Sequence, residues 1–261
     1  AFHRGDIRDA GLVGRLLKRH RVESVVHLAA RAGVRPSVAD PVLYAQVNVE
    51  GTSVVLEASR KAGVARILFA SSSSVYGRSA RLPFREEEPF DRPESPYAAT
   101  KRAGELLCAA HHSLYGTPIL ALRLFTVYGP RQRPDMAIQR FARAILDGRE
   151  IPMFGDGSSR RDYTHVSDIV DGIVAGLGWR KGFEIVNLGG SKTITLRGLI
   201  ALLARAAGRP ARLRRLPDQE GDVPATYADV SKAGRLLGYA PRTALPAGIA
   251  GFVADLRKAS A

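Results

Sequence analysis

The amino-acid sequence predicts an α/β protein built around a parallel β-sheet with helices on both of its faces. Three near-continuous apolar runs, at residues 23–30, 65–71 and 118–125, alternate with segments whose apolar residues recur at helical spacing. Strands that are buried on both faces are typically continuous apolar runs, whereas half-exposed strands alternate apolar and polar residues. Alternation of such strands with helices is typical of parallel sheets, because each crossover connection contains a helix.

The first predicted helix is long and has clear signals at both ends. It follows the strand at 23–30 and spans residues 41–62. Asp40 and Pro41 are typical of a helix start, and Gly63 is typical of a helix end. This helix therefore connects the first two strands as a crossover.

The second strand and the second helix are placed in the same way. The strand at 65–71 runs into further serines, and a helix at 96–115 leads to the strand at 118–125. Ligands of such sheets bind outside the carboxyl ends of the strands. Ala30 and Ser72 both fall at such ends, so we expect them to lie near a binding site.

The pattern changes after about residue 130, where loops are longer and richer in Pro, Gly and Arg. We expect residues 1–130 to form the sheet domain and residues 131–261 to form mainly a smaller α/β lobe, interleaved with the end of the sheet domain. The elements predicted in this half are strands at 151–154, 184–188 and 211–215 and helices at 136–147, 165–178, 196–207 and 246–258.

The most informative pattern is a group of hydroxyl, phenol and amine side chains near the end of the second strand. Residues 71–74 are four serines, and Tyr97 and Lys101 lie four residues apart in the predicted helix, one turn apart on one face. An ammonium beside a phenol favours the phenolate, which can accept a proton near neutral pH. A serine beside the phenol can hold the alcohol that loses this proton. The group predicts oxidation of a secondary alcohol by a nicotinamide cofactor.

The start of the chain does not supply the whole of a dinucleotide-binding sheet. Such a sheet has a first strand that runs into a Gly-rich turn, and an acidic residue after the second strand. Residues 5–9 (Gly-Asp-Ile-Arg-Asp) are instead predicted to be the end of a third strand. We therefore expect the N-terminal βαβ unit to be missing and the sequence to be an N-terminally truncated fragment.

Composition and charge exclude several other classes of protein. The net charge is +14 over 261 residues, but the arginines are dispersed and no nucleic-acid-binding motif is found, so we expect no nucleic-acid partner. No apolar stretch is long enough to span a bilayer, and we expect no membrane partner. The single cysteine, Cys108, excludes an internal disulfide framework and fits a cytoplasmic location. The six histidines lack the spacing of metal ligands, so we expect no metal.

Several segments together resemble the extended short-chain dehydrogenase/reductases that act on nucleotide sugars, and within them the nucleotide-sugar 4-epimerases. The matching segments are residues 5–9, 27–35, 69–77, 95–101, 122–137, 155–168 and 187–190. The resemblance implies a Rossmann-type doubly wound parallel sheet, NAD as the cofactor and a UDP-sugar as the substrate. It also implies a homodimer, for which the apolar stripe on residues 103–115 would supply the interface.

The resemblance further implies roles for individual residues. Tyr97 would be the catalytic base, and Lys101 would lower its pKa. Ser72 would bind the sugar 4-hydroxyl, with Ser74 nearby. The implied cofactor-binding residues are Asp6, Ile7, Leu28, Ala29, Ala30, Tyr97, Lys101 and Phe125. The implied substrate-binding residues are Ser72, Thr126, Arg133, Arg161 and Asp222.

The choice among reactions depends on the residues before the Val-Tyr-Gly segment. Related dehydratases carry an Asp-Glu pair there, because loss of water needs a general acid and a base. This chain has Ser73 and Ser74, whose hydroxyls have too high a pKa for that work. Dehydration is therefore disfavoured. The resemblance implies instead that C4 of UDP-glucuronate is inverted through a transient 4-keto sugar. The alternatives are a UDP-glucose 4-epimerase or another dehydratase or oxidoreductase of the family.

Two positions bear on the sugar, and one further alternative stays open. Arg133 matches the residue that meets the C6 carboxylate in glucuronate epimerases, and a guanidinium can clamp a carboxylate through two hydrogen bonds. Gln219 stands where some UDP-glucose epimerases carry a second phosphate-binding arginine. The second alternative is a non-catalytic nucleotide-binding fragment, which the missing glycines favour and the intact Ser72, Tyr97 and Lys101 oppose.

Overall fold

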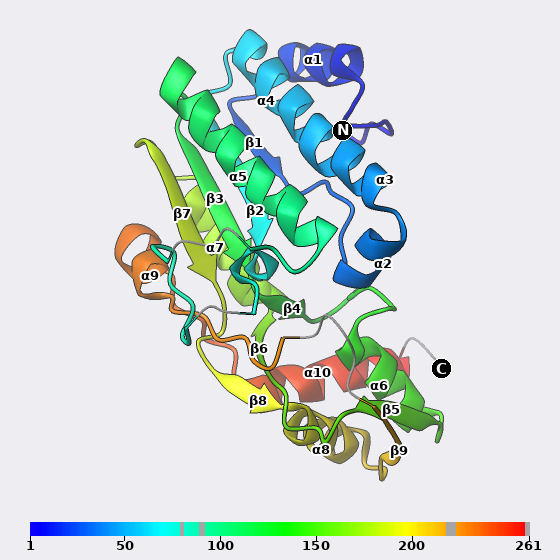
Figure 1. Ribbon diagram of the computed structural model, residues 1–261. Coiled ribbons are helices and arrows are strands. Elements are labelled where there is room, and N and C mark those ends of the chain that lie inside the picture. Colours follow the sequence, from blue (N-terminus) through cyan, green and yellow to red (C-terminus); the bar gives the residue numbers. More distant parts are fainter. Residues whose placement is uncertain (79–80, 89–91, 218–222, 259–261) are drawn as a thin grey trace.

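A four-stranded parallel sheet forms the centre of the larger of two lobes, as predicted (Figure 1). The computed structural model describes residues 1–78, 81–88, 92–217 and 223–258. The strand order is β1-β2-β3-β7. The strands are β1 (Ser24–His27), β2 (Arg66–Ser72), β3 (Ile119–Leu124) and β7 (Phe183–Leu188).

Helices cover both faces of this sheet, which confirms the predicted fold class. Phe69 of β2 packs in a cluster with residues of α4 (Gly51–Ala62) and α5 (Pro96–Tyr115). The next residue back, Leu68, packs on the opposite face with α7 (Val166–Gly176). Successive side chains of a strand point to opposite faces, so burial on both sides explains why the predicted strands are continuous apolar runs.

The helix predicted at 41–62 begins and ends where its signals indicate, but it is not regular throughout. It consists of α3 (Pro41–Ala45), the π-helical segment η1 (Gln46–Glu50) and α4. The Asp40 carboxylate caps its start by accepting the Leu43 N–H at 3.1 Å. Gly63, with φ of +71°, ends it in the left-handed conformation that glycine adopts readily.

Helix α5 lies close against strand β2. Its start is capped by the Ser95 hydroxyl, which accepts the Ala98 N–H at 3.1 Å. A Cβ atom at Gly104 would collide with the Phe69 ring, so a glycine is needed for this approach of helix to strand. The close packing fixes the distance between the serines at the end of β2 and the first turns of α5.

In its described residues, the second lobe contains two small sheets and three helices that share one core. The three-stranded sheet has the order β4-β6-β8, and β5 pairs with β9. The strands of this lobe are β4 (Thr126–Tyr128), β5 (Glu150–Phe154), β6 (Arg160–His165), β8 (Thr193–Thr195) and β9 (Arg212–Leu216). The helices α6 (Ala137–Leu146), α8 (Leu196–Ala207) and α10 (Leu245–Lys258) pack around Ile138, Leu199 and Phe252.

The chain passes repeatedly between the two lobes. After β6 it returns through α7 and β7 to the main sheet, and then leaves it again for β8, α8 and β9. Helix α9 (Ser231–Leu237) packs beside β7 before α10 completes the second lobe (Figure 1).

The beginning of the chain differs from the prediction. Residues 5–9 form a turn that pairs with no strand in the described part of the chain, so the predicted strand end is wrong. Within this turn, Asp6 Oδ2 forms an ion pair with Arg8 Nη2 at 2.7 Å. Helix α1 (Ala10–Arg19) follows, and its Asp9 cap accepts the Leu12 N–H at 2.8 Å. None of the helices in the described segments has both the length and the apolar character that crossing a membrane requires.

Candidate active site

The carboxyl ends of β1, β2 and β3 open into one cavity of about 690 Å³. This is the position at which parallel sheets bind ligands. Most of the site residues predicted from the sequence line this cavity. They are Leu28, Ala30, Ser72, Ser74, Tyr97, Lys101, Phe125, Thr126 and Arg133.

Strand β2 delivers two serine hydroxyls to the cavity. Ser72 is the last residue of the strand, and the short helix η2 (Ser73–Tyr76) follows directly. The Ser72 hydroxyl accepts the Ser74 N–H at 3.2 Å and donates to the Ser74 hydroxyl oxygen at 3.2 Å. The turn after the strand thus holds both hydroxyls on the cavity side.

Tyr97 lies in the first turn of α5 and is fixed from two directions. Its backbone N–H donates to the Ser37 hydroxyl of α2 (Val34–Ala39) at 3.1 Å. Its ring meets the Tyr44 ring edge-on, with centroids 6.2 Å apart. Burial raises the pKa of the Tyr97 phenol, while a hydrogen bond with Ser72 and the charge of Arg133 lower it.

Lys101 lies one turn further along α5, at the floor of the cavity. Its side chain is only 5% exposed, and Nζ donates to the Ala70 carbonyl at 2.6 Å. Burial lowers the pKa of Lys101 to about 8. The sequence assigned to Lys101 the lowering of the Tyr97 pKa. Nζ of Lys101 is turned to the β2 backbone, and the charge of Arg133 also lowers the pKa of Tyr97, so the role of Lys101 stays a prediction.

A buried asparagine that the sequence analysis missed links the segment after β1 to α5. Asn48 lies in the π-helical segment η1, and its Oδ1 accepts the Arg31 N–H at 2.7 Å. Its Nδ2 donates to the Arg31 carbonyl at 3.0 Å and to the Thr100 hydroxyl at 3.0 Å. π-Helical turns are frequent at functional sites. Here the turn brings one amide to the backbone beside Ala30 and to the residue before Lys101.

Arg133 reaches the cavity from the loop after β4, and it has a partner that the sequence analysis missed. Its Nε donates to Asp135 Oδ1 at 3.0 Å, and its Nη2 donates to Asp135 Oδ2 at 2.6 Å. The pair is half-exposed, and the Asp135 carboxylate raises the pKa of Arg133. Nη2 also donates to Met136 Sδ at 3.7 Å, so the two N–H groups of Nη1 are left for other acceptors.

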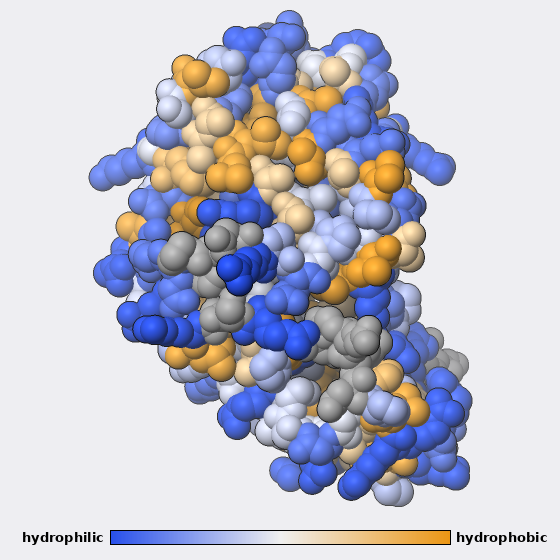
Figure 2. Space-filling view, in the orientation of Figure 1, coloured by the Kyte–Doolittle hydropathy of each residue, from blue (hydrophilic) through white to orange (hydrophobic). Residues whose placement is uncertain are grey.

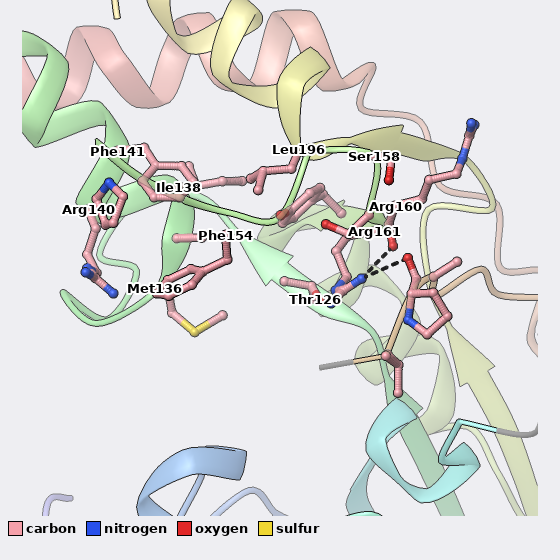
Figure 3. A pocket seen from close by; sticks show the side chains of 18 of the residues that line it. Thr126, Met136, Ile138, Arg140, Phe141, Phe154, Ser158, Arg160, Arg161 and Leu196 are labelled. Atoms are coloured by element: carbon pink, nitrogen blue, oxygen red, sulfur yellow. Dashed lines mark hydrogen bonds between the residues drawn. The ribbon is translucent and has the colours of Figure 1, made fainter. Parts of the chain in front are cut away.

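A second cavity of about 850 Å³ adjoins the first within the second lobe (Figure 3). Thr126 lines both cavities, and Arg161 lines the second. Arg161 Nη1 donates to the Arg160 carbonyl at 2.9 Å and to the Pro224 carbonyl at 3.5 Å, which holds its guanidinium beside Thr126 (Figure 3). Arg35 also lines both cavities, and its guanidinium lies 5.8 Å from the centre of the Phe154 ring.

Three predicted cofactor residues do not line either cavity. They are Asp6, Ile7 and Ala29. Arg8 lowers the pKa of the Asp6 carboxyl to about 2 by hydrogen bonding to it. Ile7 packs where a Cβ atom at Gly51 of α4 would lie. Asp222 and Gln219 fall outside the described residues.

The first cavity fits the nicotinamide end of a dinucleotide cofactor. An ammonium has three donors, and the described residues give Lys101 one acceptor, the Ala70 carbonyl. Its remaining donors can serve ribose hydroxyls, and the small side chain of Ala30 leaves room beside the backbone after β1. Among the described residues, no three His, Cys, Asp or Glu side chains are grouped as metal ligands would be.

Comparisons with known proteins agree with this geometry. A family model described as the NAD dependent epimerase/dehydratase family matches residues 1–189. A UDP-glucuronate 4-epimerase of Thermodesulfobacterium geofontis is 41% identical over 249 residues, which are 95% of this chain and 76% of the relative.

Two solved structures superpose over nearly the whole chain. A UDP-glucuronic acid 4-epimerase from Bacillus cereus, in complex with UDP-glucuronic acid and NAD, has a TM-score of 0.92 at 35% identity, with 99% of this chain and 82% of that chain covered. A UDP-glucose 4-epimerase from Thermotoga maritima, with UDP-glucose, has a TM-score of 0.94 at 32% identity, with 100% and 85% covered.

Proposed function

Because this chain belongs to the NAD-dependent epimerase/dehydratase family, we propose that it inverts C4 of UDP-glucuronate with NAD as its cofactor. One observation carries the proposal: Ser72, Tyr97 and Lys101 line a single cavity at the carboxyl ends of the parallel strands. No acidic residue stands beside them in η2, where Ser73 and Ser74 take the place of the acid and base of a dehydratase. The site can therefore move a proton at a sugar alcohol but is not equipped to eliminate water.

The residues divide the chemistry as follows. Ser72 holds the 4-hydroxyl of the sugar, and Tyr97 accepts the proton of that hydroxyl as the carbon is oxidised. NAD, which Lys101, Ala30 and Phe125 would hold in this cavity, would supply the acceptor and the donor for the C4 hydride. Tyr97 then gives the proton back to the new 4-hydroxyl, so the enzyme ends in its starting state.

The cofactor is assigned to the first cavity and its surroundings. Leu28, Ala30 and Phe125 would contact it, and Lys101 would hold its ribose hydroxyls. Ala29 is assigned to the same backbone segment, and Asp6 and Ile7 are assigned to the adenine end. We accordingly assign residues 1–130 to cofactor binding and residues 131–261 mainly to the substrate lobe.

The substrate is assigned to the two adjoining cavities. Arg133 and Thr126 would bind the C6 carboxylate, because both line the cavity that contains Tyr97. Arg161 would bind the diphosphate, since its guanidinium lies in the second cavity and an arginine matches phosphate geometry. Asp222 would bind the uridine ribose.

We also propose a homodimer formed through α5 and α4. Leu106 is 58% exposed and Leu114 is 71% exposed on α5, and apolar side chains gather on the face that α5 and α4 cover (Figure 2). A two-fold axis would bury this surface against its own copy. Leu106→Asp should then convert the protein to a monomer in analytical ultracentrifugation.

The buried Cys108, reduced and unpaired, supports a cytoplasmic location.

The proposed reaction is tested with UDP-glucuronate, UDP-glucose and UDP-N-acetylglucosamine as parallel substrates. We expect UDP-glucuronate to be converted to its C4 epimer, UDP-galacturonate, and product sugars to be separated by ion-exchange chromatography. Substrate deuterated at C4 should keep its label at C4, because the hydrogen returns to the same carbon. Loss of the label to solvent would contradict the mechanism, and a preference for UDP-glucose would favour the neutral-hexose epimerase.

A further inference from the structure

A buried cluster of charged and polar groups lies directly behind the serine strand. The Glu105 side chain on α5 is 1% exposed and accepts hydrogen bonds from three side chains. The Ser71 hydroxyl donates to its Oε1 at 2.6 Å, Arg123 of β3 donates to both carboxylate oxygens at 2.8 and 2.9 Å, and Arg102 donates to Oε2 at 2.8 Å. The Arg123 guanidinium also lies 4.7 Å from the centre of the Tyr76 ring.

Stability alone does not explain why this pair is buried. Removing two charges from water costs free energy that a salt bridge recovers only with full hydrogen bonding. Nη1 of Arg123 has no hydrogen-bond acceptor among the described residues. Apolar side chains of similar size at the two positions would fill the same space without the charges.

The cluster connects the elements that carry the proposed catalytic residues. Ser71 and Ser72 are neighbours on β2, so their side chains leave the strand on opposite sides. Glu105 lies one turn beyond Lys101 on the helix that begins with Tyr97. Arg123 ties the same carboxylate to β3, which pairs with β2 up to Ser72 and Leu124.

We propose that Glu105 and Arg123 are positioning residues, which act through Ser71 to hold the end of β2 against α5 so that Ser72 faces the Tyr97 phenol. The carboxylate is the point at which strand and helix are joined, and the arginine keeps it in place. A shift of the strand end by about 1 Å would move the Ser72 hydroxyl off the phenol, and such a shift can reduce a rate about a hundredfold.

Two variants separate positioning from folding. Ser71→Ala removes only the hydroxyl that joins β2 to the carboxylate and leaves the Glu105–Arg123 pair intact. The double variant Glu105→Leu with Arg123→Met replaces the charges by apolar side chains, which is often neutral or stabilising. Arg102→Ala is the matched control, because it removes a donor from the same carboxylate at its half-exposed side without touching either strand.

Kinetics on UDP-glucuronate give the first readout, and this arm rests on the proposed function. We expect kcat to fall about fivefold for Ser71→Ala and about thirtyfold for the double variant, with KM changed less than about twofold, because misplaced groups slow the chemical step. Arg102→Ala should match the parent protein. An unchanged kcat in a folded double variant overturns the proposal.

Ionisation of Tyr97 gives a second readout that needs no turnover. Phenolate absorbance is titrated for each protein and for its Tyr97→Phe version, and the difference isolates Tyr97 from the other tyrosines. Because the hydrogen bond with Ser72 favours the phenolate, the pKa of Tyr97 should rise further in both test variants. An unchanged Tyr97 titration overturns the proposal even if the proposed substrate proves wrong.

Discussion

Arg133→Ala should reduce activity on UDP-glucuronate much more than activity on UDP-glucose. Charge-assisted hydrogen bonds contribute about 1.5 to 3 kcal/mol, and about 1.4 kcal/mol corresponds to tenfold in an equilibrium or rate constant. Asp135 already takes two of the N–H groups of Arg133, and the pair is half-exposed, so the lower half of that range applies. We therefore expect kcat/KM for UDP-glucuronate to fall about ten- to fiftyfold. Because the charge of Arg133 also lowers the pKa of Tyr97, kcat/KM for UDP-glucose should fall too, but less than about threefold.

The assay compares initial rates on the two substrates for the parent protein, Arg133→Ala and one control. Arg149→Ala is the matched control, because Arg149 is paired with an aspartate two residues away, at 2.7 Å, and lines neither cavity. Asp135→Asn gives a further comparison, since its neutral amide oxygen competes less strongly than a carboxylate for the donors of Arg133 and should lower KM for UDP-glucuronate. Equal losses on both substrates in Arg133→Ala would refute the assignment of Arg133 to the carboxylate.

Three further predictions concern the base, a buried histidine and the packing of α5. Tyr97→Phe should lower kcat by about 10² to 10⁴, the usual contribution of a general base, with little change in nucleotide binding measured by calorimetry; a loss below tenfold would contradict its role. Burial lowers the pKa of His27 to about 4 from 6.5, so the stability linked to its neutral form is complete above pH 6.5 and is lost as the pH falls towards 4. Over that interval the free energy of unfolding, measured by urea denaturation, should fall by about 3 kcal/mol more for the parent protein than for His27→Gln. An equal fall in both proteins would show that His27 is not responsible. Gly104→Ala should lower stability by about 1 to 3 kcal/mol in the same measurement, because its Cβ meets the Phe69 ring; the control Gly251→Ala, where a Cβ meets nothing within 4 Å, should not.

The elements of the main sheet could be predicted because their signals are local. The helix that ends at Gly63 and the helix that starts after Ser95 carry a left-handed glycine and a hydroxyl cap, each of which acts within one turn. Strand β2 is apolar from Ile67 to Ala70 because it is covered on both faces. Strand β8 has only three residues and depends on pairing with β6, which no local pattern reveals.

The residues of the candidate site also divide into those that local sequence signals reveal and those that depend on the fold. Tyr97 and Lys101 could be found from their spacing, because one helix carries both. Asp135 and Asn48 were missed because their roles depend on partners that the fold brings to them. The direction of the Tyr97 pKa could not be foreseen either, since burial sets it and the sequence does not show how deeply the phenol is buried.

The passage of the chain through β7 restricts how new sugar preferences can be acquired. A lobe formed by one continuous segment of the chain could be exchanged between relatives by a single recombination event. Here the main sheet takes its fourth strand from residues 183–188, which follow β4, β5 and β6 of the second lobe and precede its β8 and β9. A chimaera with one crossover point would therefore combine an edge strand from one parent with a sheet from the other. Diversification of this scaffold is expected to proceed by substitution within loops such as that of Arg133 rather than by shuffling of whole lobes.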